Sequence, residues 1–293
     1  DTLSYSGYSS SVTVSLSSAT SASSATGISG SVTGFESLVG GSGTDTLNAT
    51  SGVNNLNVAS GGITTLDSSL TVSGFETINL GANSDSSSDT ATISGAFSGT
   101  VDLGAGNDTA TINDGGSFTS LVGGGGTDTL NLDGANNSIT VTATGAGTTA
   151  GTTGSTTTFS GFETVSGQDG TDAFTVNSAS SSTISLDGGT GTDSLSVAVS
   201  DGTANSVMIS GAGSGNLGNV SFSGMESIAL GSGGDTATVS GGGSLSSNLD
   251  LGSGNNTLTF SSGAGSVGSV TSGSGTDTIT ISGGSVTGAV NAG

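Results

Sequence analysis

The chain has 293 residues and contains no Lys, Arg, His, Cys, Pro or Trp, but 56 Gly and 22 acidic residues. Its formal net charge of −22 disfavours nucleic acid and anionic membranes as partners, and the absence of Cys excludes a disulfide framework. Because no conventional activated nucleophile can be assembled from these residue types, the sequence predicts that the protein is not an enzyme. No apolar run of about 18 residues is present, so no membrane span is expected.

One turn motif recurs along the chain. In chain order its best copies are GGSGTDTLN at 40–48, GGGGTDTLN at 123–131, GGTGTDSLS at 188–196 and SGSGTDTIT at 272–280. Looser copies lie at 103–111, 167–175, 230–238 and 251–259. A degraded copy spans 80–92, where either Asp85 or Asp89 could hold the motif position. Repeats of this kind indicate a solenoid or another repeat architecture.

The spacing of the motif Asp gives the period of the repeat. Asp108 and Asp128 are 20 positions apart, and Asp172 and Asp193 are 21 apart. Other gaps are near doubles, such as the 44 positions from Asp1 to Asp45, which suggests coils that have lost the motif. The period is therefore about 20 to 22 residues, and the chain has room for roughly 14 coils.

The segment after each motif Asp alternates apolar and polar residues, as in Asp108–Ile112, where Ala110 and Ile112 are expected to point inward. Gly-rich corners would join such strands. We therefore expect an all-β fold, a parallel β-solenoid that forms a single repeat domain over residues 1–293. Neither end carries a polar capping segment, so end-to-end self-association, or continuation in a longer chain, is expected.

A second motif, GFE or GME followed by two strand residues, occurs at 34–38, 74–78, 161–165 and 224–228 and holds all four Glu of the chain. The simplest interpretation is that the Phe or Met fills the core while the Glu caps backbone amides at a corner.

The turn motif resembles the GGxGxDxUx nonapeptide (U, apolar) of the repeats-in-toxin family, and its alternation with GFE is similar to repeat regions of secreted bacterial adhesins and surface-layer-like proteins. The resemblance implies that motif carboxylates and turn carbonyls bind Ca²⁺ while U faces the core. The implied metal ligands are Asp45, Asp108, Asp128, Asp172, Asp193, Asp235, Asn256 and Asp277. The implied core positions are Leu47, Ala110, Leu130, Phe174, Leu195, Ala237 and Ile279.

The chain departs from that family in having one motif per coil, where the family has two. A shared ion needs motifs on neighbouring coils, so the best sites are expected at the pairs Asp108/Asp128, Asp172/Asp193 and Asn256/Asp277. The alternative is a turn without metal, in which stacked Asp or Asn side chains satisfy corner amides.

These patterns predict a structural, extracellular protein of the cell surface: part of a filament, a surface layer or an adhesin stalk, with cell-surface glycans as a further expected partner. The alternative is a solenoid that binds ice or another surface through outward Thr-x-Thr pairs. These pairs occur at Thr90/Thr92, Thr109/Thr111, Thr236/Thr238, Thr257/Thr259 and Thr278/Thr280.

Overall fold

A computed structural model describes residues 1–81, 86–150, 156–177, 183–198 and 202–293. These residues form β-strands joined by turns, and none of them lies in a helix. In the described ranges there is accordingly no helix with the length and hydropathy needed to cross a membrane. The chain divides into two compact units: unit 1 comprises Asp1–Asp133 and Thr153–Phe162, and unit 2 comprises Gly134–Thr152 and Glu163–Gly293.

Unit 1 contains two sheets, and the strands of each are named in the order in which they pair. Sheet 1 consists of β1 (Thr2–Ser4), β5 (Ser37–Val39), β9 (Leu70–Ser73), β8 (Thr64–Leu66), β7 (Asn55–Val58), β11 (Thr90–Ile93), β14 (Thr109–Ile112) and β17 (Thr129–Asn131). Sheet 2 consists of β4 (Val32–Thr33), β3 (Ser21–Ala25), β2 (Thr13–Ser18), β6 (Thr46–Asn48), β10 (Thr77–Asn79), β12 (Ala96–Asp102), β15 (Ser117–Val122) and β20 (Thr156–Ser160).

Unit 2 repeats this plan. Its sheet 1 consists of β21 (Thr164–Ser166), β24 (Ile184–Asp187), β29 (Val220–Ser223), β28 (Ser214–Leu217), β27 (Ser206–Gly211), β31 (Thr236–Val239), β33 (Thr257–Phe260) and β35 (Thr278–Ile281). Its sheet 2 consists of β19 (Ala146–Ala150), β18 (Ser138–Ala143), β23 (Ala173–Val176), β26 (Ser194–Val197), β30 (Ser227–Ala229), β32 (Leu245–Asp250) and β34 (Ser266–Thr271), which pairs with both β36 (Ser285–Val286) and β37 (Val290–Asn291).

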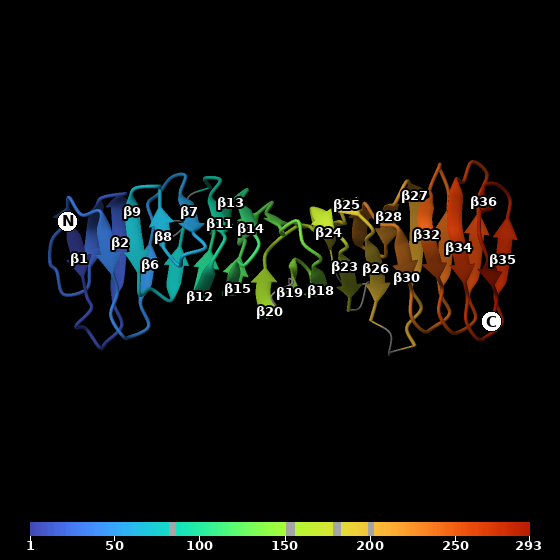
Figure 1. Ribbon diagram of the computed structural model, residues 1–293, viewed down its shortest axis with the longest axis horizontal. Helices are drawn as coiled ribbons and strands as arrows, with labels where there is room; N and C mark the ends of the chain where they lie inside the picture. The colour runs from blue at the N-terminus through green and yellow to red at the C-terminus, as the bar shows by residue number, and fades with distance from the viewer. Residues whose placement is uncertain (82–85, 151–155, 178–182, 199–201) are drawn as a thin grey trace. The chain divides into compact units, whose positions relative to one another are not determined.

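Along most of the chain, strands alternate between the two sheets, and each pairs in parallel with the strand one coil earlier. In unit 2 the chain runs from β30 through β31, β32, β33 and β34 to β35, so that β32 and β34 lie side by side in sheet 2 (Figure 1). Where no reversed strand intervenes, the residues at matching positions of neighbouring coils are 19, 20 or 21 positions apart. The predicted all-β parallel solenoid is confirmed, with the period that the motif spacing indicated.

The long gaps between motif Asp residues contain strands that run in the opposite direction. Three of them hold an antiparallel meander: β2–β3–β4 and β7–β8–β9 in unit 1, and β27–β28–β29 in unit 2. A fourth holds the antiparallel pair β18–β19. We expected coils without a motif in these gaps. A reversed strand has the same two-residue alternation as a parallel one, so the pattern could not distinguish them, and chain length divided by the period does not count the coils.

The core is a narrow layer between the inward faces of the two sheets. Ala110 and Ile112 of β14 are 0 % and 7 % exposed, whereas Thr109 and Thr111 are partly exposed, as the alternation predicted. The aromatic or Met of the second motif also lies in this core. Phe35, Phe75, Phe162 and Met225 are exposed by 5 % or less. Two further short parallel pairings lie at the corners between strands: β13 (Ala105–Gly106) pairs with β16 (Gly125–Gly126) in unit 1, and β22 (Asp169–Gly170) pairs with β25 (Thr190–Gly191) in unit 2.

Candidate functional site

The motif Asp occupies one fixed place in the coil, directly before a strand and inside the corner. Six of the eight predicted ligand positions are Asp residues with 0 % or 1 % exposure; Asn256 is equally buried at 1 %, and Asp277 is partly exposed. Their buried neighbours match the prediction as well. Six of the seven predicted core positions are fully buried, and Ile279 of β35 is partly exposed.

Each of these side chains accepts a hydrogen bond from the backbone of the preceding coil, and we name the resulting series the corner ladder. In unit 1, Asn54 N–H donates to Asp89 Oδ1 at 2.7 Å, Asp89 N–H to Asp108 Oδ1 at 2.7 Å and Asp108 N–H to Asp128 Oδ1 at 2.8 Å. Val12 N–H likewise donates to Asp45 Oδ1 at 2.8 Å. Each bond satisfies a buried amide that lies just before its strand begins.

Unit 2 contains two such series. Asn137 and Asp172 donate from their backbone N–H groups to the Oδ1 atoms of Asp172 and Asp193, both at 2.7 Å. The other series runs from Asn205 through Asp235 and Asn256 to Asp277, with distances of 2.6, 2.9 and 2.9 Å. The three pairs predicted to share an ion are therefore adjacent, and each is joined by a bond from backbone to side chain.

Glu of the second motif takes the Asp position in the ladder where a meander has replaced a turn motif. Asp45 N–H donates to Glu76 Oε2 at 2.8 Å, and Asp193 N–H donates to Glu226 Oε2 at 2.7 Å. Glu36 accepts a hydrogen bond from the ammonium group of Asp1. The predicted capping of corner amides is confirmed for Glu76 and Glu226. Glu76 and Glu226 each cap the Asp of the preceding coil and not the Asp that follows them in the chain.

The first Gly of the motif leaves room for the second carboxylate oxygen. A Cβ placed on Gly188 would lie 2.8 Å from Asp193 Oδ2 and 2.2 Å from the carbonyl oxygen of Gly224. At Gly40 the corresponding distances to Asp45 Oδ2 and the carbonyl oxygen of Gly74 are 2.8 and 1.9 Å. A side chain at either of these two glycines would collide with the ladder and with the neighbouring coil, whereas the copies at 103–111, 230–238 and 251–259 hold Leu at this position.

The Asn residues of the ladder reveal what surrounds that second atom. Asn256 Nδ2 donates to the carbonyl oxygens of Gly252, Gly254 and Ser272 at 3.3, 3.4 and 3.2 Å. Asn205 Nδ2 donates to Thr203 O and Leu230 O, both at 3.1 Å. The corners of Asn256 and Asn205 therefore present carbonyl oxygens to the second side-chain atom, whereas at Asp45 the Gly41 amide donates to Oδ2. Asp193 Oδ2 has no hydrogen-bond partner among the described residues.

Carbonyl oxygens beside a carboxylate are ligands of the kind that Ca²⁺ takes in proteins. Against this, the described part of the chain holds no group of three or more acidic, His or Cys side chains positioned for a metal ion. The Oδ1 atoms are also engaged in bonds to the backbone, as the alternative without metal predicted. Calcium at the corner stays a prediction.

Several ladder residues were missed or left open by sequence reasoning. Asn54, Asn137 and Asn205 each begin a ladder series, and the signal that could have identified them was an Asn directly before an alternating strand. Between the two candidates in the degraded motif, the structure places Asp89 in the ladder, while Asp85 lies outside the described residues.

Outward Thr residues line up across neighbouring strands of sheet 1. In unit 2 the pairs Thr236/Thr238, Thr257/Thr259 and Thr278/Thr280 are in register on β31, β33 and β35. In unit 1, Thr90/Thr92 and Thr109/Thr111 are in register on β11 and β14, and the row continues as Thr129 and Asn131.

Comparison with known proteins gives no family: neither a family model, nor a curated protein, nor a solved structure matches this chain.

Proposed function

We propose that this chain is a non-enzymatic structural element of an extracellular assembly such as a filament, a surface layer or an adhesin stalk. The observation that carries the proposal is the corner ladder. In each series, one buried side chain per coil ties the backbone of the preceding coil at the same place. Such repetition stabilises neighbouring coils against local opening, which is the property that a load-bearing or persistent surface protein needs.

Composition supports the same conclusion. The buried carboxylates of the ladder are engaged in hydrogen bonds to the backbone, and the chain has no His, Cys, Lys or Arg to act with its acidic residues. A chain without Lys and Arg also offers no cleavage site to trypsin-like proteases. This would favour survival outside the cell.

Electron microscopy of the purified protein tests the proposal. We expect filaments, sheets or end-to-end chains of particles at micromolar protein concentration. A population of separate particles that stays separate with added calcium and on a surface, together with a measurable hydrolytic activity, would contradict it.

We propose calcium at the corner as the cofactor of this assembly, on the chemistry of one carboxylate with several carbonyl oxygens per coil. Unfolding midpoints compared in sodium, magnesium and calcium chloride test this part independently of the microscopy.

A second candidate function is binding to ice or to another regular solid surface. The register of the three Thr-x-Thr pairs on β31, β33 and β35 favours it, because it produces two parallel rows of hydroxyl and methyl groups on one sheet face. A thermal-hysteresis measurement decides the matter: a gap between melting and freezing points that disappears in Thr257→Lys supports ice binding, and no gap in the wild-type protein excludes it.

A further inference from the structure

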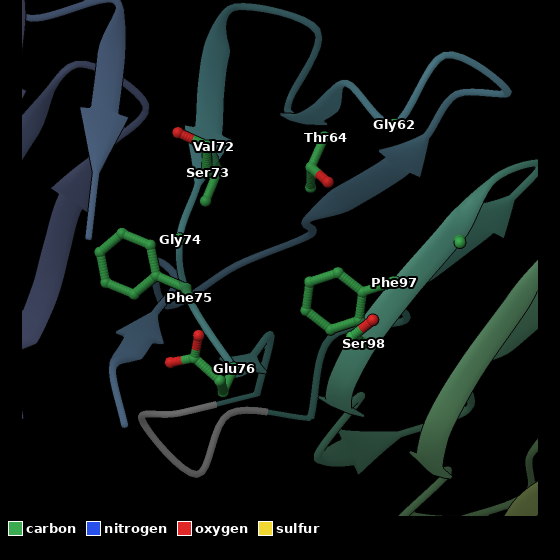
Figure 2. Close-up of a pocket in the computed structure, with 10 residues that line it drawn as sticks. Gly62, Thr64, Val72, Ser73, Gly74, Phe75, Glu76, Phe97 and Ser98 are labelled. Carbon is green, nitrogen blue, oxygen red and sulfur yellow. The ribbon is translucent and has the colours of Figure 1, made fainter. Parts of the chain in front are cut away.

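A cleft beside Glu76 is not used by the ladder or by the proposed assembly. It lies in unit 1, has a volume of about 220 Å³, and is lined by the start of β8, the end of β9, the corner before β10 and the start of β12. Figure 2 shows the Phe97 ring on one side of it, the backbone of residues 73–75 on the other and the Glu76 carboxylate below. The Phe75 ring points away into the core, where it is 5 % exposed.

The cleft exists because β12 begins differently from its neighbours. The pairing of β12 with β15 shifts register between Phe97 and Thr100, and Gly99 stands at the irregular position. A Cβ on Gly99 would lie 2.3 Å from the carbonyl oxygen of Glu76 and 2.8 Å from Cε1 of Phe97. Gly99 thus allows the aromatic ring to approach the Glu76 backbone, and Phe97 stays partly exposed instead of entering the core.

The chemistry of the walls selects the ligand. Phe97 supplies an aromatic ring, Val72 and Ala96 supply apolar surface, and Glu76 supplies a negative charge in a chain that has no Lys, Arg or His. One carboxylate oxygen of Glu76 accepts the Asp45 amide and holds the group in place. An aromatic ring together with a fixed carboxylate attracts an organic ammonium ion. Among such ions, a quaternary ammonium is weakly hydrated, so it loses the least hydration free energy on entering a half-open cleft.

We propose that this cleft binds a quaternary ammonium group, with Phe97 contacting its methyl groups and Glu76 balancing its charge. The proposal is separate from the structural function: either could hold without the other.

Unit 2 provides a matched control for the charge. Glu226 has the same ladder bond as Glu76, at 2.7 Å from the Asp193 amide, but the neighbouring strand β32 begins with Leu245, which is 2 % exposed. The variants Glu76→Gln and Glu226→Gln remove one negative charge each and retain an oxygen that can accept the ladder bond. They therefore change the net charge of the protein equally.

The experiment is an NMR titration of the intact chain with choline chloride at ionic strength held constant with NaCl, following the methyl groups of Val72 and Ala96. Saturable shifts are expected in the wild-type protein. Glu76→Gln and Phe97→Leu should each weaken binding about tenfold, and Glu226→Gln should leave it unchanged. Thermal unfolding checks that each variant is folded. If Phe97→Leu does not fold, the comparison of Glu76→Gln with Glu226→Gln tests the proposal by itself.

A neutral molecule of the same shape, 3,3-dimethyl-1-butanol, separates charge recognition from simple filling of an apolar cleft. Equal binding of both molecules overturns the proposal. So does the absence of shifts with choline, or equal weakening by Glu76→Gln and Glu226→Gln, which would show general attraction of cations to an anionic protein.

Discussion

At a position of the corner ladder, Asp and Asn present the same first oxygen to the preceding coil and differ only in the second atom. For Asn256 that atom is a donor facing three carbonyl oxygens, and for Asp193 it is an acceptor without a hydrogen-bond partner in the described structure. A buried acceptor without a donor costs about 1–3 kcal/mol. The identity of the second atom should therefore set the stability of each corner.

Asp193→Asn should stabilise the protein by about 1–2 kcal/mol at neutral pH without divalent cations, because the new amide can donate to the corner carbonyls while Oδ1 keeps the Asp172 amide. Urea unfolding with a chelator present measures the change. Asp114→Asn, at an exposed turn, removes the same charge and should change the free energy of unfolding by less than about 0.5 kcal/mol. Destabilisation by Asp193→Asn would show that the corner does not favour a donor.

Asp102, at the end of β12, is expected to make the stability of the protein depend on pH. Burial raises the pKa of its carboxyl group above the ordinary value, and a hydrogen bond from the Gly104 amide opposes this with a smaller effect. Since the folded-state pKa exceeds the unfolded one, the protonated form contributes stability that is present in acid and is lost as the pH rises through the folded-state pKa.

Asp102→Asn should consequently be more stable than the wild type at pH 7, by less than about 1 kcal/mol because the group is partly solvated. The difference should vanish as the pH falls below the ordinary aspartate pKa. Parallel urea titrations at pH 3 and pH 7 measure it, and a difference that is constant with pH would assign the effect to packing.

At the scale of the element, the turn motif can be explained position by position. A Cβ on Gly123 would lie 2.1 Å from the carbonyl oxygen of Gly161, whereas one on Gly125 would meet nothing within 4 Å. Gly125 holds the variable position of the motif, where the other copies have Ser42, Thr190 and Ser274. The motif thus has Gly at position 123, where neighbouring coils are in close contact, and varies at position 125, where there is open space.

Gly123→Ala should destabilise the protein by about 2 kcal/mol or more, because either the corner or the neighbouring coil must move. Gly125→Ala, in the same corner, should be within about 0.5 kcal/mol of the wild type. Thermal and urea unfolding of the two variants measure the contrast, and similar losses in both would show that the corner relaxes freely.

Features that depend on residues close together in the chain could be predicted from the sequence, and features that depend on which distant strands pair could not. The alternation in strands such as β14 and the fixed place of Asp108 identified the solenoid, its period and its buried corner, because each depends on neighbours within one coil. The meanders and the Asp45–Glu76 bond could not be predicted, because they depend on which strand returns beside which.

At the scale of the whole molecule, charge acts on stability without regard to individual contacts. The chain has a net charge of −22 and no Lys, Arg or His, so its acidic side chains have no internal cation except the amino terminus. Mutual repulsion therefore opposes the compact state, and it weakens as salt shortens the screening length from about 10 Å at 0.1 M to about 3 Å at 1 M.

Added NaCl should therefore stabilise the protein, raising the unfolding midpoint between about 0.01 M and 1 M. CaCl₂ at the same ionic strength should raise it further, by at least about 1 kcal/mol in free energy of unfolding if ions bind at the corners. MgCl₂ is the control, since a smaller ion with strict octahedral geometry fits a ring of carbonyl oxygens poorly. Equal midpoints in all three salts would refute calcium binding and leave only screening, while a midpoint that falls with NaCl would refute the argument from repulsion itself.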